Sequence, residues 1–352
     1  MSELINGVDR IWFTRCPVPT ATGIAYKLGW LDEEFAKDGI AVSTLQDGPR
    51  EYNRHHYDHQ LRTLIREGGS LLAIAARAQY APTRLIGLTW IDEWQAILVR
   101  PDSGITEPHQ LKGKRLALPA FVDHPIKDHV RGSSIARGMS LHGYKGALGI
   151  AGLTLDDVEL VEVAAAGQGR GDGRRSREVV GSLWAGLDEL VAGNLDAVYV
   201  KGASAVEAAK RLGVVVGIDL DSYPDKRVRV NNGTPRPITV HEDLLENHFD
   251  LVVRFLYQTL RAADWAKHNL QGVHAILQDE TFAGAESVAT AYRNDFHLNL
   301  EPTLTPDRLA LFRKQKDFMW VYGLLDRDFD FDAWVDQRPL QEAKRQLEAK
   351  VA

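Results

Sequence analysis

The sequence predicts an α/β protein with two lobes, and three observations support this prediction. Short apolar runs alternate with stretches of helical periodicity along most of the chain, which is typical of a mostly parallel sheet flanked by helices. The 352 residues are 44% hydrophobic and 26% charged, which is enough for a normal core. Pro- and Gly-rich crossings at "VRPDSG" and "NNGTPRPITV" predict hinges. We therefore expect one lobe from 1–101 and 233–352 and an inserted lobe from 102–232.

The first part of the chain gives the clearer alternation. "RIWFTRC" is typical of a strand, and "ATGIAYKLGWLDEEFAKDG" of a helix, because Ile24, Leu28 and Leu31 recur at helical spacing before Gly39. "IAVSTLQ" predicts the next strand, and "YDHQLRTLIREGG" predicts a helix closed by Gly68 and Gly69. The runs "SLLAIAARA", "TRLIGLTWI" and "QAILVRP" continue the apolar series.

The later elements follow the same pattern. "ITEPHQLKGKRLALP" predicts a loop, a charged turn and a strand, and "DHPIKDHVRGSSIARGMSLHGY" a helix. "DDVELVEV" predicts a strand, "SLWAGLDELVAGNLDAVYVKG" a helix, turn and strand, "SAVEAAKRLG" a helix and "VVVGIDL" a strand. From His241 onward the pattern is mainly helical.

The net charge and the first residues of the chain restrict which partners and which cellular compartment we expect. The net charge of −6 argues against nucleic acid or an anionic membrane as the main partner. No apolar run approaches the roughly 18–20 residues of a membrane span, and the first residues lack the features of a secretion signal. We expect a cytoplasmic monomer. A single cysteine cannot form an internal disulfide.

Several motifs resemble known families. "ITEPHQLKGKRLALP" and "LDELVAGNLDAVYV" resemble segments of type II periplasmic solute-binding proteins. "CPVP", "REGG", "DDVELVEV", "AGNLDAVY" and "AADWAKHN" together resemble the 2'-hydroxybiphenyl-2-sulfinate desulfinase family from about residue 8 to 336. This resemblance implies a two-lobed type II periplasmic-binding-protein-like fold, each lobe a mixed sheet flanked by helices. It also implies release of sulfite from a small aromatic anionic substrate, an aryl sulfinate, without cofactor or metal.

The resemblance also implies the site residues. Cys16 matches the family's cysteine, Arg66 its arginine and Gly69 the glycine whose backbone amide contacts substrate. The family's histidine precedes the arginine by ten residues, which selects His56 if no gap intervenes, with His55 and His59 as the alternatives.

The residues themselves suggest the chemistry. A guanidinium bridges two anionic oxygens, and a glycine lets its N–H approach them. Cys16 would attack sulfur or deliver a proton to the ring carbon, with His56 tuning it, and Tyr57 is a candidate ring contact. Lys201 and Gly202 stand in "VKGASA", where the family has a tryptophan-bearing segment, and this departure weakens the inference of biphenyl specificity more than the inference of the chemistry.

Structural interpretations compete with these functional ones. A lone cysteine is often a small buried hydrophobe, and an arginine before two glycines can simply end a helix. His55 and His59 have zinc-like spacing, but no third ligand follows. "GQGRGDG" resembles a phosphate loop superficially, and a surface or lid loop is expected there. The main functional alternative is a non-catalytic binding protein for an aromatic sulfonate or related acid; a cysteine-assisted lyase for another aromatic acid is a third.

Overall fold

The computed structural model describes residues 7–14, 17–121, 130–164 and 184–351. Cys16 lies outside these residues, as does the "GQGRGDGRRSRE" loop. The fold below is therefore built from the strands and helices of the described ranges.

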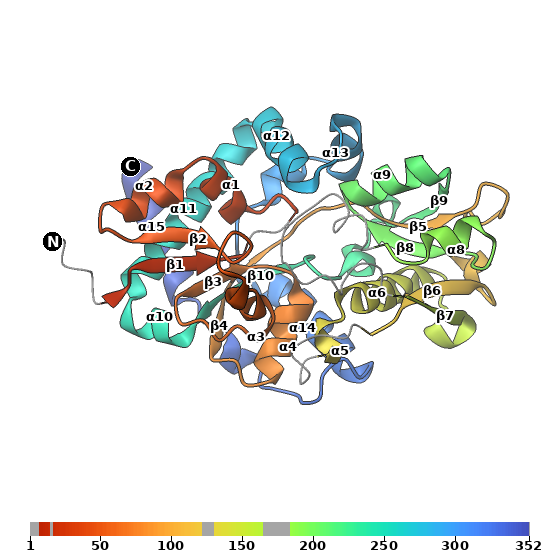
Figure 1. The fold of residues 1–352 in the computed structure, drawn as a ribbon, viewed down its shortest axis with the longest axis horizontal. Helices are drawn as coiled ribbons and strands as arrows, with labels where there is room; N and C mark the ends of the chain where they lie inside the picture. Colours follow the sequence, from red (N-terminus) through yellow and green to blue (C-terminus); the bar gives the residue numbers. More distant parts are fainter. Residues whose placement is uncertain (1–6, 15–16, 122–129, 165–183, 352) are drawn as a thin grey trace.

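The described strands form sheets of five, three and two strands (Figure 1). The five-stranded sheet has the order β2-β1-β3-β10-β4, and the three-stranded sheet has the order β8-β5-β9. Strand bounds are β1 Arg10–Phe13, β2 Ala41–Thr44, β3 Leu64–Glu67, β4 Thr83–Thr89, β5 Gln95–Val99, β6 Arg115–Pro119, β7 Glu159–Val163, β8 Val198–Lys201, β9 Val215–Asp219 and β10 Arg236–His241.

The sheets are mixed, so the expectation of a mostly parallel sheet was wrong in part. β1 runs parallel to β2 and β3, and β6 runs parallel to β7. β10 is antiparallel to both β3 and β4, and β5 is antiparallel to both β8 and β9. The physical reason is the connectivity: β10 enters the five-stranded sheet late in the chain, from the opposite direction.

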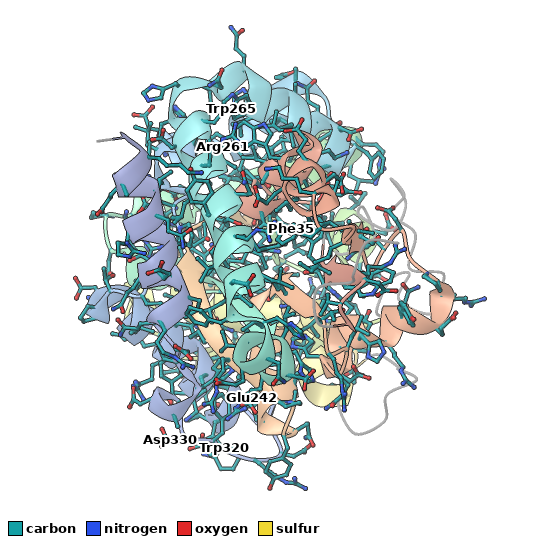
Figure 2. All side chains as sticks on the ribbon, turned by 90° about the vertical axis from the view of Figure 1, so that its left-hand side faces the viewer. Phe35, Glu242, Arg261, Trp265, Trp320 and Asp330 are labelled. Carbon is teal, nitrogen blue, oxygen red and sulfur yellow. The ribbon has the colours of Figure 1, made fainter. Side chains whose placement is uncertain are left out.

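Helices cover both faces of the sheets. In the left half of Figure 1, α1 and α15 pack on α11, and in the right half α6 packs near β6 and β8. Figure 2 looks onto the end covered by α11, where Arg261 and Trp265 lie on its outer part. Helix bounds are α1 Ala21–Lys27, α2 Trp30–Ala36, α3 His55–Asp58, α4 Ser70–Ala78, α5 Val130–Ser133, α6 Ile135–Ile150, α8 Leu187–Val191, α9 Ala203–Leu212, α10 Glu242–Asn247, α11 Phe249–His268, α12 Leu270–Thr281, α13 Ala285–Ala291, α14 Pro306–Val321 and α15 Arg338–Val351.

Strand pairing shows where the chain crosses between the sheets. β5 already pairs with β8 and β9, although it precedes residue 101, and β10 returns to the five-stranded sheet shortly after residue 233. The lobe boundaries 1–101 with 233–352, and 102–232, stay predictions. Among the described helices, none has the length and apolar character needed to span a bilayer.

The segment before the glycine pair was predicted as one helix, and this was wrong. Residues 55–58 form the short helix α3, the chain turns, and β3 follows with all four residues buried. Leu64 and Ile65 fit a helical pattern locally, but pairing of β3 with β1 and β10 overrides that preference. The correction places Arg66 on a central strand, and Gly69 before α4 instead of after a helix.

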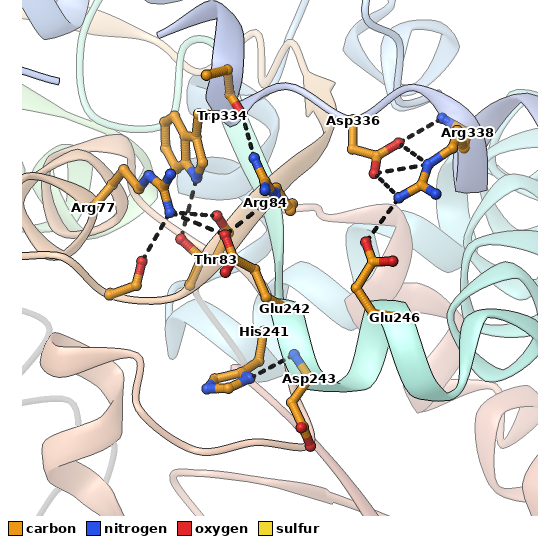
Figure 3. A network of polar contacts seen from close by, with 12 residues as sticks. Arg77, Thr83, Arg84, His241, Glu242, Asp243, Glu246, Trp334, Asp336 and Arg338 are labelled. Carbon is orange, nitrogen blue, oxygen red and sulfur yellow. Dashed lines mark hydrogen bonds and ion pairs between the residues drawn. The ribbon is translucent and has the colours of Figure 1, made fainter. Parts of the chain in front are cut away.

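A polar network lies at β4, an edge strand of the five-stranded sheet (Figure 3). Glu242, which begins α10, accepts a hydrogen bond from Arg77 at 3.3 Å and pairs with Arg84 at 3.2 Å. Trp334 Nε1 donates to Thr83 Oγ1 at 3.2 Å. These contacts hold β4, α4 and the C-terminal segment together.

Candidate functional site

A cavity of about 180 Å³ brings residues from both large sheets together. Its lining comes from β3, β8 and β10, from α3, α4, α6 and α9, from the end of α12, and from the loops between elements. The lining residues are Pro17, Val18, His56, Arg66, Gly69, Leu72, Glu93, Ile135, Met139, Trp184, Lys201, Ala203, Ser204, Asn232, Arg236 and Thr281. Three residues predicted for the site, His56, Arg66 and Gly69, are therefore brought together.

Arg66 is held by its own motif. Its side chain is 1% exposed, and its Nη1 donates to the Gly69 carbonyl oxygen at 3.1 Å. A Cβ on Gly68 would stand 2.3 Å from the Arg66 guanidinium carbon, so the side chain can fold back only because residue 68 is glycine. The neighbouring carboxylate of Glu67 points to the other face of β3, where Thr89 Oγ1 donates to it at 2.9 Å.

Gly69 is required for a different contact. It is the N-cap of α4, and a Cβ there would stand 2.3 Å from Asn232 Oδ1. The Asn232 oxygen instead accepts a hydrogen bond from the Leu71 N–H at 3.1 Å. The start of α4 therefore lies at the cavity, with Gly69 and Leu72 in the lining, and the helix dipole favours negative charge there.

The structure separates the three histidines. His55 Nδ1 lies 2.8 Å from Asp58 Oδ1, and His59 Nε2 lies 3.1 Å from the His56 carbonyl oxygen. Neither of these two lines the cavity, whereas His56 does. Of the three histidines, His56 is therefore the one that lines the cavity, and its functional role stays a prediction.

Tyr57 and Cys16 differ from the other predicted residues. The Tyr57 ring contacts the His56 ring edge to face at 5.1 Å but does not line the cavity. Burial raises the pKa of Tyr57, and the positive charge of Arg66 opposes that rise. Cys16 lies outside the described residues, and the next residue, Pro17, lines the cavity.

A second charged cluster was not predicted. Lys201, at the end of β8, is 7% exposed; its Nζ lies 2.5 Å from Glu93 Oε2 and donates to the Asn232 carbonyl oxygen at 2.9 Å. Glu93 also accepts a hydrogen bond from Tyr292 at 2.9 Å. Arg236, the first residue of β10, is 4% exposed. Its place at the cavity follows from the antiparallel register of β10, for which the sequence carries no signal.

The crossing segment that carries Asn232 is fixed by a buried polar network. Asn231 Nδ2 donates to the Tyr199 hydroxyl at 2.9 Å and to the Met139 carbonyl oxygen at 3.0 Å. The Tyr199 hydroxyl donates to Gln95 Oε1 at 2.7 Å. Asn231 Oδ1 in turn accepts from the Asn232 N–H at 2.7 Å. These bonds tie residues 231–232 to β5, β8 and α6.

The remaining wall is largely apolar. Val18, Leu72, Ile135 and Met139 present aliphatic or thioether groups to the cavity. Trp184 adds an aromatic surface, held by a 3.1 Å hydrogen bond from its Nε1 to Ser204 Oγ. The lining therefore combines an apolar wall with buried cations, a combination suited to an aromatic anion.

Charge at the cavity is unequal. Arg66, Lys201 and Arg236 bring three positive charges, and Glu93 is the one carboxylate among the lining residues. Burial raises the pKa of Glu67, just outside the lining, which favours its neutral form. Within the described ranges, no three His, Cys, Asp or Glu side chains gather in a way that would hold a metal ion.

The arrangement of two large sheets around a cavity is the fold of type II periplasmic-binding-protein-like proteins. The Escherichia coli periplasmic aliphatic sulphonate binding protein SsuA superimposes with a TM-score of 0.65 at 16% identity, covering 94% of this chain and 92% of SsuA. The two-lobed class predicted from the sequence is confirmed. No family model matches the chain.

Within that class, the resemblance to the desulfinase is also confirmed. The chain is 26% identical to 2'-hydroxybiphenyl-2-sulfinate desulfinase of Rhodococcus erythropolis over 365 aligned residues, 95% of this chain and 93% of that protein. The crystal structure of the desulfurization enzyme DszB matches with a TM-score of 0.76 at 23% identity, covering 96% of this chain and 99% of DszB. A cysteine-to-serine variant of DszB in complex with biphenyl-2-sulfinic acid matches with a TM-score of 0.73 at 24% identity over 96% of this chain and 99% of that one.

Proposed function

We propose that this protein is an aryl sulfinate desulfinase, which cleaves the carbon–sulfur bond of an aromatic sulfinate and releases sulfite. The observation that carries the proposal is the meeting of Arg66, Gly69 and His56 in one cavity with an apolar wall. Homology to a desulfinase over 95% of the chain supports the same chemistry.

The Arg66 end of the cavity suits the sulfinate group. A guanidinium offers paired N–H groups to two anionic oxygens. The first turn of α4 adds backbone amides and its dipole, with no side chain at Gly69 to block the approach. Donors fixed in place before the reaction typically contribute about 3–4 kcal/mol each to transition-state stabilisation.

The aromatic ring of the substrate needs an apolar surface, which the rest of the cavity wall provides. Leu72, Ile135, Met139 and Trp184 form a surface that would take the ring out of water. Excluding water strengthens the contact between Arg66 and the anion, because the local dielectric falls. The apolar wall and the buried cation therefore act on the same ligand.

Cys16 can act by either of two reaction mechanisms in this proposal, and both conserve atoms and charge. In the first, its thiolate attacks the sulfinate sulfur, the C–S bond breaks, and the ring carbon takes a proton; water then hydrolyses the enzyme–S–SO₂⁻ intermediate to thiol and bisulfite. In the second, the thiol protonates the ring carbon while SO₂ departs; water then hydrates SO₂ to bisulfite and returns a proton to the enzyme. Pro17 in the cavity lining supports both routes, since it directly follows Cys16.

His56 would handle the proton in either route. An imidazole ordinarily titrates near neutral pH, so it can accept a proton from the thiol and return it within one turnover. His56 is the cavity histidine, while His55 and His59 are engaged elsewhere.

A non-catalytic binding protein for an aromatic sulfonate or related acid is the second candidate. It is favoured by the fold match to the sulphonate binding protein SsuA. The cavity alone serves a binder equally well, because a buried guanidinium holds an anion with or without chemistry.

Sulfite release separates the two candidates. We expect the wild-type protein to release sulfite from benzenesulfinate or biphenyl-2-sulfinate, and Cys16→Ser to bind the same compounds without releasing it. Cys16→Ser is nearly isosteric, so binding by calorimetry serves as its own folding control. Tight binding by the wild-type protein with no sulfite across a panel of aryl sulfinates would establish the binder instead.

A further inference from the structure

Arg236 is a buried guanidinium for which the described part of the chain supplies no partner. It is 4% exposed, lines the cavity, and among the described residues forms no ion pair and donates no hydrogen bond. A charge removed from water without compensation is costly. Proteins accept that cost chiefly where a ligand supplies the missing opposite charge.

The charges around Arg236 do not remove the need for such a ligand. Its Nη1 stands 2.6 Å from the position of a Cβ on Gly233, and Lys201 Nζ stands 3.8 Å from the same position, so the two cations are neighbours. Glu93 is already paired with Lys201 and bonded by Tyr292. Glu67 also senses the charge of Arg236, but its carboxylate is hydrogen-bonded by Thr22 and Thr89.

The Arg236 end of the cavity is separate from the Arg66 end. The Arg66 Nη1 donates to the Gly69 carbonyl oxygen, and the Asn232 side chain packs against Gly69. Lys201 contacts the opposite part of Asn232, its backbone carbonyl oxygen. Asn232 therefore contacts the Arg66 motif at Gly69 with its side chain and Lys201 with its backbone carbonyl oxygen, so the cavity has two cationic groups with different neighbours.

We propose that the substrate is an aromatic sulfinate with a second acidic group, a carboxylate, which Arg236 and Lys201 bind while Arg66 binds the sulfinate. This inference rests on the proposed function and extends it to a dianionic substrate class. A carboxylate matches the fork of N–H donors on Arg236, and Lys201 adds a point charge beside it. The net charge of such a ligand also matches the excess of cations in the lining.

The test compares ligands that differ only in the second charge. Sulfite release is measured for the 2-, 3- and 4-carboxybenzenesulfinates and for their methyl esters, which have nearly the same shape without the charge. Binding is measured in parallel by calorimetry for the unreactive sulfobenzoates and their carboxylate methyl esters. For at least one isomer, we expect the wild-type protein to prefer the acid to the ester about 10- to 100-fold, as a charged hydrogen-bonded contact gives.

Two substitutions at Arg236 assign the preference. Arg236→Gln should reduce the acid-to-ester ratio to near 1, and Arg236→Lys should keep part of it, because the charge stays while the fork is lost. Arg84→Gln is the matched control: Arg84 lies on the neighbouring strand β4, pairs with Glu242 and does not line the cavity, so the ratio should not change.

The outcomes distinguish this inference from the function beneath it. Sulfite release without any preference for the acid in the wild-type protein would overturn the dianion inference and leave the desulfinase standing. A binding preference for sulfobenzoate that Arg236→Gln abolishes, with no sulfite from any compound, would keep the two-ended site and overturn the desulfinase. Wild-type protein that binds acid and ester equally, or binds neither, overturns the inference whatever the variants do.

Discussion

The two ends of the cavity are built in different ways. The Arg66 end comes from one short run of chain, "REGG", in which the arginine, its carbonyl acceptor and both permissive glycines lie within four residues. The Lys201–Arg236 end is assembled from β8, β10 and the loop that carries Glu93, which are far apart in sequence. Under the proposed function, the contiguous motif would hold the reacting group, while the dispersed residues would set which ligand is accepted.

The largest effect on stability is expected at the Lys201–Arg236 end of the cavity, when one member of the Lys201–Glu93 ion pair is removed. Lys201→Met leaves the Glu93 carboxylate buried, at 4% exposure, without its cation. We expect a loss of about 3–5 kcal/mol in the free energy of unfolding, measured by denaturant titration. The double variant Lys201→Met with Glu93→Gln should recover most of it, because no stranded charge remains. A double variant as unstable as the single one would contradict the pairing.

A substitution at the Arg66 end of the cavity should lower the rate of sulfite release. Arg66→Gln removes the anion's guanidinium, and we expect sulfite release to fall about 100- to 1,000-fold, or about 3–4 kcal/mol in the barrier. Thermal unfolding checks that the variant is folded, and Arg77→Gln serves as an arginine control outside the cavity. A reduction of threefold or less would remove Arg66 from the proposed mechanism.

A single methyl group tests the contact between the two ends. In Gly69→Ala the new Cβ would stand 2.3 Å from Asn232 Oδ1, so Asn232 must move away from the N-terminus of α4. We expect a cost of about 1–3 kcal/mol and weaker binding of aryl sulfinates.

Gly149→Ala in α6 is the matched control for Gly69→Ala. It has open space around the Cβ and should stabilise the protein by about 0.5–1 kcal/mol. Equal melting temperatures for the two variants would show that the Asn232 contact is not tight.

Acid should weaken a contact between the two halves in a graded way. The His142 ring on α6 stacks on Phe318 of α14 with centroids 4.0 Å apart, and burial lowers the pKa of His142 to about 3. Above the unfolded-state pKa of about 6.5, His142 is neutral in both the folded and the unfolded state, so it does not reduce the free energy of unfolding. As the pH falls from there towards 3, the unfolded state gains a proton that the folded state does not.

The stability lost from His142 should therefore reach about 1.4 kcal/mol per pH unit across that window. Urea titrations at pH 7, 6, 5 and 4 would measure the slope, and His142→Gln should be less steep by this amount. Identical slopes would show that His142 is protonated in the folded protein.

The same contrast explains what the sequence could and could not predict. His56, Arg66 and Gly69 could be proposed because the resemblance to the desulfinase family carries them over by position, and the structure places all three in the lining of one cavity. The local pattern still gave the wrong element for Arg66, since the residues of "YDHQLRTLIREGG" cannot reveal strand pairing with β10, which lies about 170 residues later. Pairing across that distance is decided by packing of the whole sheet.

The dispersed residues had weaker signals. Lys201 is the last residue of the buried strand β8, and strand ends are a place where ligand contacts gather in α/β folds; its position was noted only as a departure from the family. Arg236 and Asn232 lie in a segment predicted as a hinge, and nothing local indicates that the same residues line a cavity. A prediction of Glu93 as a site residue would have required knowing that Lys201 is buried beside it.

The connection at residues 231–236 has a mechanical consequence. It joins the three-stranded sheet to the five-stranded one, and it also supplies Asn232 and Arg236 to the cavity wall. Any rotation of one half against the other must pass through these residues and so reshape the polar wall. A ligand bound to Arg236 would in turn restrain that rotation. Ligand binding in the cavity and the relative orientation of the two halves would therefore be coupled.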